Sequence, residues 1–539
     1  MSAKGIKKTA VGKSFASVAA TFYLCALLGL SACGSEATVS STLDATDSAA
    51  SVTSEVASSD LVESSASETE QAASSSTQVA VPTEADISIN ESIEDSSDGG
   101  HAIEADGTEE AYANVAVNKT GDAAGNDEAD FYGENAAIFA TNGATLDLSD
   151  MVVKSNGTHA NGVFSYGEGT TVNIANSVIE TVGNTSGGLM TTGGGTMNAT
   201  NLNIHTTGNS SAAIRSDRGG GTVNVDGGLY VTDGTGSPVI YSTADITVSN
   251  ASLESTASEG VVVEGKNSVT LNNVDLVANN TTLNSDKSDN YKGVMIYQSM
   301  SGDAAVGSSS FTMNGGSFTN QNGDVFFVNN TVTTISLEDA TITNNGDGLF
   351  LRAAAAGWGS EGSNGGQVTL NATSQTINGD MLVDDVSNLN LYLASGSSFT
   401  GAINSDGQAG DVYVELSGGS TWTLSADSYI TSLTCDADSI NLNGYTLYVD
   451  GKAYEQGSAS TGEAIEHTVS SGGGMGAAPG EAPDGQGAPG DGGTPPEMPG
   501  GEGAPSGDGG TPPEPPSGSN GTPPEPPSGS SAPSENTSN

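Results

Sequence analysis

The chain has 539 residues, of which 13 are Lys or Arg and 65 are Asp or Glu, so its formal net charge at pH 7 is −52. Only 5% of the residues are aromatic and 74 are glycine, a composition that favours a thin, repetitive fold over one deep core. Nucleic acid is excluded as a partner, because phosphate binding needs grouped Lys and Arg and none are grouped after the first residues.

The N-terminus has the pattern of an export signal. Four lysines lie within residues 4–13, an apolar run covers 15–30, and Leu30-Ser31-Ala32-Cys33 follows. The run is too short for a stable transmembrane helix. The final four residues resemble the lipobox of bacterial lipoproteins. That resemblance implies a signal peptide over 1–32, lipid on Cys33, and membrane anchoring at the extracellular face of the bacterial cell envelope. An ordinary secretory signal with a chance cysteine is the alternative.

Two low-complexity segments flank the rest of the chain. Residues 33–100 comprise the lipidated cysteine and a Ser/Thr/Glu-rich linker, expected to be disordered because it has little apolar surface to bury. Residues 457–539 form a Gly/Pro-rich tail, also expected to be disordered, in which Gly-Thr-Pro-Pro-Glu occurs at 493–497, 510–514 and 521–525. The tail reads either as a wall-associating segment or as a plain spacer.

Between these segments the sequence repeats in units of 21 to 34 residues. Coils are expected to begin at the following residues: Ala136, Asn161, Gly187, Ala212, Pro238, Glu259, Gly293, Asp324, Asp347, Asp380 and Asp411. Each unit has three strand-like pieces. The second alternates apolar and polar residues, as in Val172-Asn173-Ile174, which predicts an inward apolar pair and an outward polar residue. The outward Thr, Ser and Asn row is interpreted as a solvated sheet face.

A residue type that tolerates left-handed backbone angles follows most second strands. These residues are Asp150, Asn176, Asn201, Gly227, Asn250, Asn273, Gly315 and Asp339. Repeated corners of this kind resemble the asparagine ladder of pectate-lyase-like proteins. The resemblance implies an all-β fold, a right-handed parallel β-helix of about 12 coils over 136–456, with an N-terminal cap over 101–135. The aromatic-richer stretch 412–450 is expected to cap the other end. Leucine-rich repeats share the period, but the coils lack their leucine content and helical half.

Two long loops are expected to emerge on one side, at 298–310 and 353–367, and to wall a cleft. The predicted ligand-binding residues lie on or beside these loops: Tyr297, Gln298, Asp303, Arg352, Trp358 and Glu361. An exposed tryptophan with polar neighbours is a common arrangement for holding a sugar ring. The competing interpretation is that Trp358 fixes its own loop and Arg352 pairs with a neighbouring acid.

Enzymatic activity is not expected. A lyase needs a strong base beside acidic calcium ligands, and a polygalacturonase-type hydrolase needs clustered aspartates. Asp384-Asp385 is the one such pair in the repeats, and adjacent strand residues face opposite ways. His159 and His205 have no triad or metal spacing around them. No catalytic residue is therefore assigned, and no cofactor is required.

Stretches such as 237–243 and 297–303 are similar to surface and carbohydrate-binding β-helix proteins of anaerobic bacteria. That resemblance implies an adhesin or carbohydrate-binding module, with a glycan or a surface protein as partner. A polysaccharide lyase or glycoside hydrolase on the same fold, and a structural envelope protein without a discrete ligand, remain alternatives. Calcium binding stays open: oxygen ligands such as Asp286 and Asp289 are abundant, but no EF-hand loop occurs.

Overall fold

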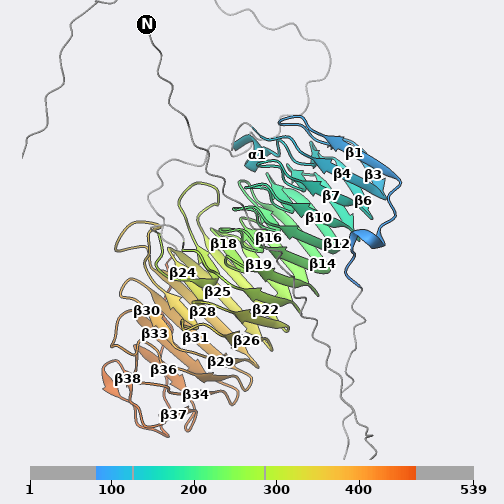
Figure 1. The fold of residues 1–539 in the computed structure, drawn as a ribbon. Helices are drawn as coiled ribbons and strands as arrows, with labels where there is room; N and C mark the ends of the chain where they lie inside the picture. Colours follow the sequence, from blue (N-terminus) through green and yellow to red (C-terminus); the bar gives the residue numbers. More distant parts are fainter. Residues whose placement is uncertain (1–79, 124–126, 284–286, 469–539) are drawn as a thin grey trace, which may run out of the picture. The chain divides into compact units, whose positions relative to one another are not determined.

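The computed structural model describes residues 80–123, 127–283 and 287–468. Nearly all regular structure in these ranges is β-strand, and consecutive coils pair in parallel (Figure 1). The predicted parallel β-helix is confirmed. The signal peptide, Cys33, most of the linker and the repeats of the tail lie outside the described residues.

The first strand of each coil belongs to one sheet, the first sheet. Its strands are β2 (Ile103–Asp106), β5 (Ile138–Thr141), β8 (Val163–Tyr166), β11 (Leu189–Thr192), β13 (Ile214–Ser216), β15 (Ile240–Ser242), β18 (Val261–Glu264), β21 (Lys292–Tyr297), β24 (Asp324–Asn329), β27 (Leu351–Ala353) and β30 (Met381–Val383).

The second strands form the second-strand face. They are β3 (Glu109–Ala113), β6 (Thr145–Ser149), β9 (Thr171–Ala175), the first halves of β12 (Gly195–Thr206) and β14 (Gly221–Thr232), β16 (Asp245–Ser249), β19 (Ser268–Asn272), β22 (Ser308–Asn314), β25 (Thr331–Glu338), β28 (Gly366–Thr373), β31 (Asn388–Ala394), β33 (Asp411–Leu416) and β36 (Ser432–Cys435). Their burial alternates as predicted, because the inward apolar residues stack in register, for example Leu146 on Val172.

The third strands form the third-strand face. They are β1 (Glu91–Asp95), β4 (Val115–Lys119), β7 (Val152–Ser155), β10 (Val178–Thr181), the second halves of β12 and β14, β17 (Ser252–Ser255), β20 (Asp275–Ala278), β23 (Ser317–Asn320), β26 (Thr341–Asn344), β29 (Thr376–Asn378), β32 (Ser398–Thr400), β34 (Thr421–Thr423) and β37 (Ile440–Asn441). The remaining elements are η1 (Glu84–Asp86), α1 (Asp127–Tyr132), β35 (Ser428–Ile430), β38 (Leu447–Val449) and β39 (Lys452–Ala453).

The corners between second and third strands have the backbone geometry that the sequence predicts. All eight predicted corner residues have positive φ, from 49° at Asn176 to 76° at Gly227. Side-chain amides connect some of them between coils: Asn201 donates to Asn176 over 3.1 Å, and Asn273 donates to Asn250 over the same distance. The asparagine ladder is therefore present in part of the stack.

Parallel pairing extends beyond the ranges in which the sequence places it. On the N-terminal side of residue 136, β2, β3 and β4 pair with β5, β6 and β7. Within the predicted linker lie η1 and β1. Strand β1 pairs in parallel with β4, and Ile87, between η1 and β1, packs with Val152 and Val178. At the other end, Asp411 does not begin a coil: it lies on β33, a second strand, and the preceding first-strand position is Ile403, which bridges to Met381.

Residues 455–468, which we call the strap, run back across the second-strand face. The amide of Gln367 exchanges two hydrogen bonds of 2.8 Å with the backbone of Thr468. Asn390 exchanges two of 2.9 Å with the backbone of Ile465. The sequence assigns residues 457–468 to the tail, but outward amides hold them on the β-helix.

Candidate functional site

The outer face of the first sheet is apolar and largely covered. Phe139, Phe164 and Met190 form one buried cluster in its N-terminal half. Val262, Met295, Tyr297 and Phe327 form another, with Trp358 packed against it. These side chains occupy outward positions of paired strands. They are nevertheless buried, because α1 and the loops between strands cover them, and burial of apolar side chains is favourable.

Two of the predicted ligand-binding residues meet here: Tyr297 belongs to the second cluster, and Trp358 packs against it. The ring of Trp358 meets that of Tyr297 edge to face at 5.1 Å between centroids. The hydroxyls of Tyr241 and Tyr297 both donate to Glu264 Oε2, over 2.5 and 2.9 Å. Burial, and then the carboxylate of Glu264, raise the pKa of Tyr297 well above its usual value, so its hydroxyl remains a proton donor. Trp358 is intermediate in exposure and packs on Tyr297, which is the arrangement that the competing interpretation describes.

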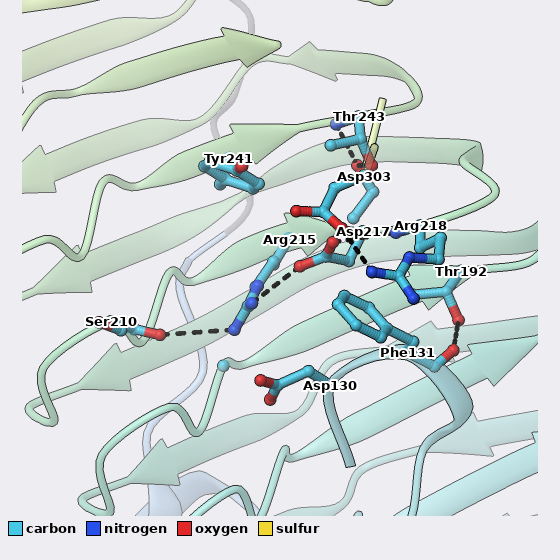
Figure 2. A network of polar contacts seen from close by, with 12 residues as sticks. Asp130, Phe131, Thr192, Ser210, Arg215, Asp217, Arg218, Tyr241, Thr243 and Asp303 are labelled. Carbon is cyan, nitrogen blue, oxygen red and sulfur yellow. Dashed lines mark hydrogen bonds and ion pairs between the residues drawn. The ribbon is translucent and has the colours of Figure 1, made fainter. Parts of the chain in front are cut away.

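Asp303 belongs to a polar network over the same sheet (Figure 2). Its carboxylate accepts a hydrogen bond of 2.9 Å from Arg218, whose guanidinium lies 3.8 Å from the centre of the Phe131 ring. Beside it, Arg215 pairs with Asp217 over 2.8 Å. Burial raises the pKa of Asp217, and Arg215 opposes the shift. The network joins loop 298–307 to α1.

The other predicted residues are not gathered around an open space. Gln298 is buried, whereas Glu361 is exposed. Arg352 forms two hydrogen bonds with Asp324, over 2.6 and 3.3 Å. The hollow between the two loops, lined by Gln298 and Asn330 among others, has a volume of only about 20 Å³. That is hardly more than the space of one water.

A larger cleft opens where the loop cover ends. It has a volume of about 400 Å³, within the usual order of magnitude for small-ligand sites. We call it the acidic cleft. Its lining residues are Leu349, Arg352, Asp380, Met381, Leu382, Asp384, Asp385, Asn404, Ser405, Asp406, Gly407 and Ala409. Arg352 is the one predicted site residue that lines it.

Several polar groups of the acidic cleft lack a partner within the described part of the chain. Asp385 and Asp406 are exposed and make no side-chain hydrogen bond or ion pair there. Asn404 is 5% exposed, and its Nδ2 is buried with no acceptor among the described residues. Its Oδ1 accepts from the Val383 amide over 2.8 Å, which fixes the orientation of the side chain. A buried donor without an acceptor is costly, and Asn404 is one of the residues that line the cleft.

The two other aspartates of the cleft shape its wall. Asp380 accepts from the Ala402 amide and the Ser425 hydroxyl, over 2.8 and 2.7 Å. Asp384 accepts from the Ala355 amide over 2.7 Å. The charge of Arg352 is already paired with Asp324, so the cleft carries the charge of four aspartates and repels anionic ligands.

Asp384 and Asp385 are not on opposite faces of a strand, contrary to the expectation from the sequence. Asp384 and Asp385 lie on the turn after β30, not within a strand, so the alternation of strand residues does not separate them. Both line the acidic cleft. The sequence signal that was available is the run of aspartates in corresponding turns of neighbouring coils, at 384–385 and 406.

Three further findings bear on the expectations. Among the described residues, no group of three or more His, Cys, Asp or Glu side chains is arranged to hold a metal ion. The described ranges also contain no helix long and apolar enough to span a membrane. No protein-family model and no curated protein matches the sequence of this chain.

Proposed function

We propose that the chain is a lipid-anchored protein of the bacterial cell surface whose β-helix binds neutral or amino-bearing glycans in the acidic cleft. The observation that carries the proposal is the combination of Asn404, Asp385 and Asp406. They offer a donor and two acceptors without partners at the wall of one 400 Å³ cleft.

A glycan matches this chemistry in two ways. Sugar hydroxyls are both donors and acceptors, so they satisfy the carboxylates of Asp385 and Asp406 and the amide of Asn404 together. The C–H faces of sugar rings are apolar, and Leu349 and Leu382 supply apolar surface in the same cleft. Such a mixture of apolar lining and a few placed polar groups is typical of small-ligand sites.

Charge narrows the class of glycan. Four aspartates line the cleft, and its arginine is already paired, so uronate or sulfated polymers are disfavoured by repulsion. Amino sugars gain an attractive contribution from the same carboxylates. The lyase alternative, which acts on acidic polysaccharides, fits this cleft poorly.

A hydrolase on the same site is the second candidate function. Glycoside hydrolysis uses two carboxyl groups on opposite sides of the scissile bond, and the acidic cleft collects four. Appearance of new reducing ends when the protein is incubated with the glycan that it binds would favour this candidate over binding alone.

The binding test uses the full-length protein in detergent and a panel of neutral, amino-bearing and uronate oligosaccharides. Asp385→Asn combined with Asp406→Asn should weaken the best binder by roughly tenfold to a hundredfold, because two charge-assisted hydrogen bonds are lost. Glu361→Gln is the matched control: it removes an exposed carboxylate outside the cleft and should change nothing. Preference for uronates, unchanged binding in the double variant, or no glycan binding would contradict the proposal.

The anchor is tested separately. Cys33 lies outside the described residues, and its lipidation rests on the lipobox resemblance. Cells expressing the protein are labelled with radioactive palmitate; the label should be incorporated in the natural chain and absent in Cys33→Ala. Label retained in the variant would rule out Cys33 as the lipid site.

A further inference from the structure

The second-strand face carries a shallow trough over β3, β6, β9, β12, β14 and β16. Two adjoining hollows of about 360 and 410 Å³ share Asn198 and Thr200 in their lining, so they form one continuous feature. Six strands at about 4.8 Å spacing make it about 24 Å long, the length of roughly seven extended residues. It lies on a different face from the acidic cleft.

The floor of the trough is a ladder of side-chain amides. Asn224 donates to Asn198 over 3.0 Å, Asn198 to Asn173 over 2.9 Å, and Asn173 to Asp147 over 2.7 Å. Each amide has a second N–H and further acceptor capacity. Because the ladder orients the amides, their remaining groups are presented to a ligand at little entropic cost.

Amides on these outer faces already hold extended backbone elsewhere in the described chain. On the same face, Gln367 and Asn390 each exchange two hydrogen bonds with the strap. Near the trough, Asn201 and Asn203 donate to the carbonyls of Ala80 and Pro82, over 3.3 and 2.9 Å. Binding of extended polypeptide by outward amides is thus a recurring contact of this β-helix.

The charge of the trough specifies the partner further. Asp147 and Asp226 line it, and no Lys or Arg does. We propose that the trough binds an extended polypeptide segment with basic side chains, its backbone held by the amide ladder and its cations by the two aspartates. The partner is another protein, because the two segments that flank the β-helix, 33–100 and 457–539, contain no Lys or Arg.

The experiment measures anisotropy of a fluorescent ten-residue peptide of alternating lysine and threonine, with the full-length protein in detergent at low salt. Counterparts with glutamine or glutamate in place of lysine separate the contributions of backbone and charge. Asp147→Asn with Asp226→Asn should weaken the lysine peptide on the order of tenfold and leave the glutamine peptide unchanged. Asn173→Ala with Asn198→Ala should weaken both by about fivefold, because backbone contacts are lost.

Two controls locate the effect. Asn371→Ala changes an outward amide of β28, on the same face but outside the trough, and should have no effect. Asp385→Asn with Asp406→Asn disables the acidic cleft and should also leave peptide binding intact. The proposal fails if the glutamate peptide binds as tightly as the lysine peptide, or if no peptide binds at a protein concentration of about 1 mM. It also fails if Asn371→Ala or the cleft variant weakens peptide binding as much as the trough variants do. Displacement of the peptide by a neutral glycan would contradict it too.

Discussion

At the scale of single residues, the corners between second and third strands are where sequence and structure agree most closely. Asn250 has φ of 54°, donates to Asp226 over 2.8 Å and accepts from Asn273 over 3.1 Å. The sequence predicts such corners because few residue types tolerate this conformation, and the pattern recurs at one place in each coil.

Replacing Asn250 with valine should lower the free energy of unfolding by about 2 kcal/mol, because a β-branched residue is strained at positive φ and the ladder bonds are lost. Asn250→Gly should cost less, since glycine adopts this conformation without strain. Urea unfolding of both variants, beside Thr247→Val on the adjoining strand as control, measures the difference. Equal losses for valine and glycine would show that strain is not the cause.

Lys292 is a buried charge that the sequence does not reveal. Its ammonium donates to Ser288 and to the Asn290 carbonyl, over 2.8 and 3.0 Å, and lies 4.7 Å from the centre of the Phe327 ring. Burial lowers its pKa from 10.5 to about 8, although Glu259 and Asp324 oppose the shift.

The lowered pKa of Lys292 sets the sign of a pH effect. Below pH 8 both the folded and unfolded states hold the proton. Between about pH 8 and 10.5 the unfolded state holds one proton more than the folded state. Lys292 therefore makes the free energy of unfolding rise with pH over this range, by an amount on the order of 3 kcal/mol. Lys292→Met should lack that rise. Urea midpoints of both proteins from pH 7 to 10 test this, and a constant difference between them would contradict it.

At the scale of elements, strand periodicity predicts the coils, but it contains no information on how the loops between them fold. Arg218 and Asp303 are 85 residues apart, yet their side chains meet in a hydrogen bond (Figure 2). The sequence predicts an exposed platform at Trp358, and this side chain is intermediate in exposure. Its ring packs on Tyr297 and on the outward apolar residues of β21 and β24, a contact that strand periodicity does not predict.

Trp358→Ala should lower the free energy of unfolding by about 2 kcal/mol, from lost burial and the lost edge-to-face contact with Tyr297. Trp358→Phe should retain most of this stability, because phenylalanine keeps an aromatic ring at the same place. Glycan affinity at the acidic cleft should be unchanged in both variants, because Trp358 does not line the cleft. Thermal unfolding and glycan titration of the same samples provide the two measurements. Lost affinity at full stability would instead restore the loop site that the sequence predicts.

At the scale of the whole described region, the acidic cleft depends on side chains from three neighbouring coils. Arg352, Asp380 and Asn404 come from successive coils of unequal length. Strand pairing fixes how these residues line up between coils; for example, Arg352 pairs with Leu382. The cleft is open because the loops that cover the first sheet end there. Coil boundaries read from sequence are off by several residues near Asp411, so the sequence alone could not align these residues.

The most direct test of the central claim is a methyl NMR titration of the full-length protein with the glycan that binds best. We predict that the methyl signals of Leu349 and Leu382 shift together as the glycan is added. Those of Met295 and Val262, which lie beneath the loop cover, should remain in place. Binding in the acidic cleft would be contradicted if only the covered methyl signals shifted, or if the cleft methyl signals did not shift at saturating glycan.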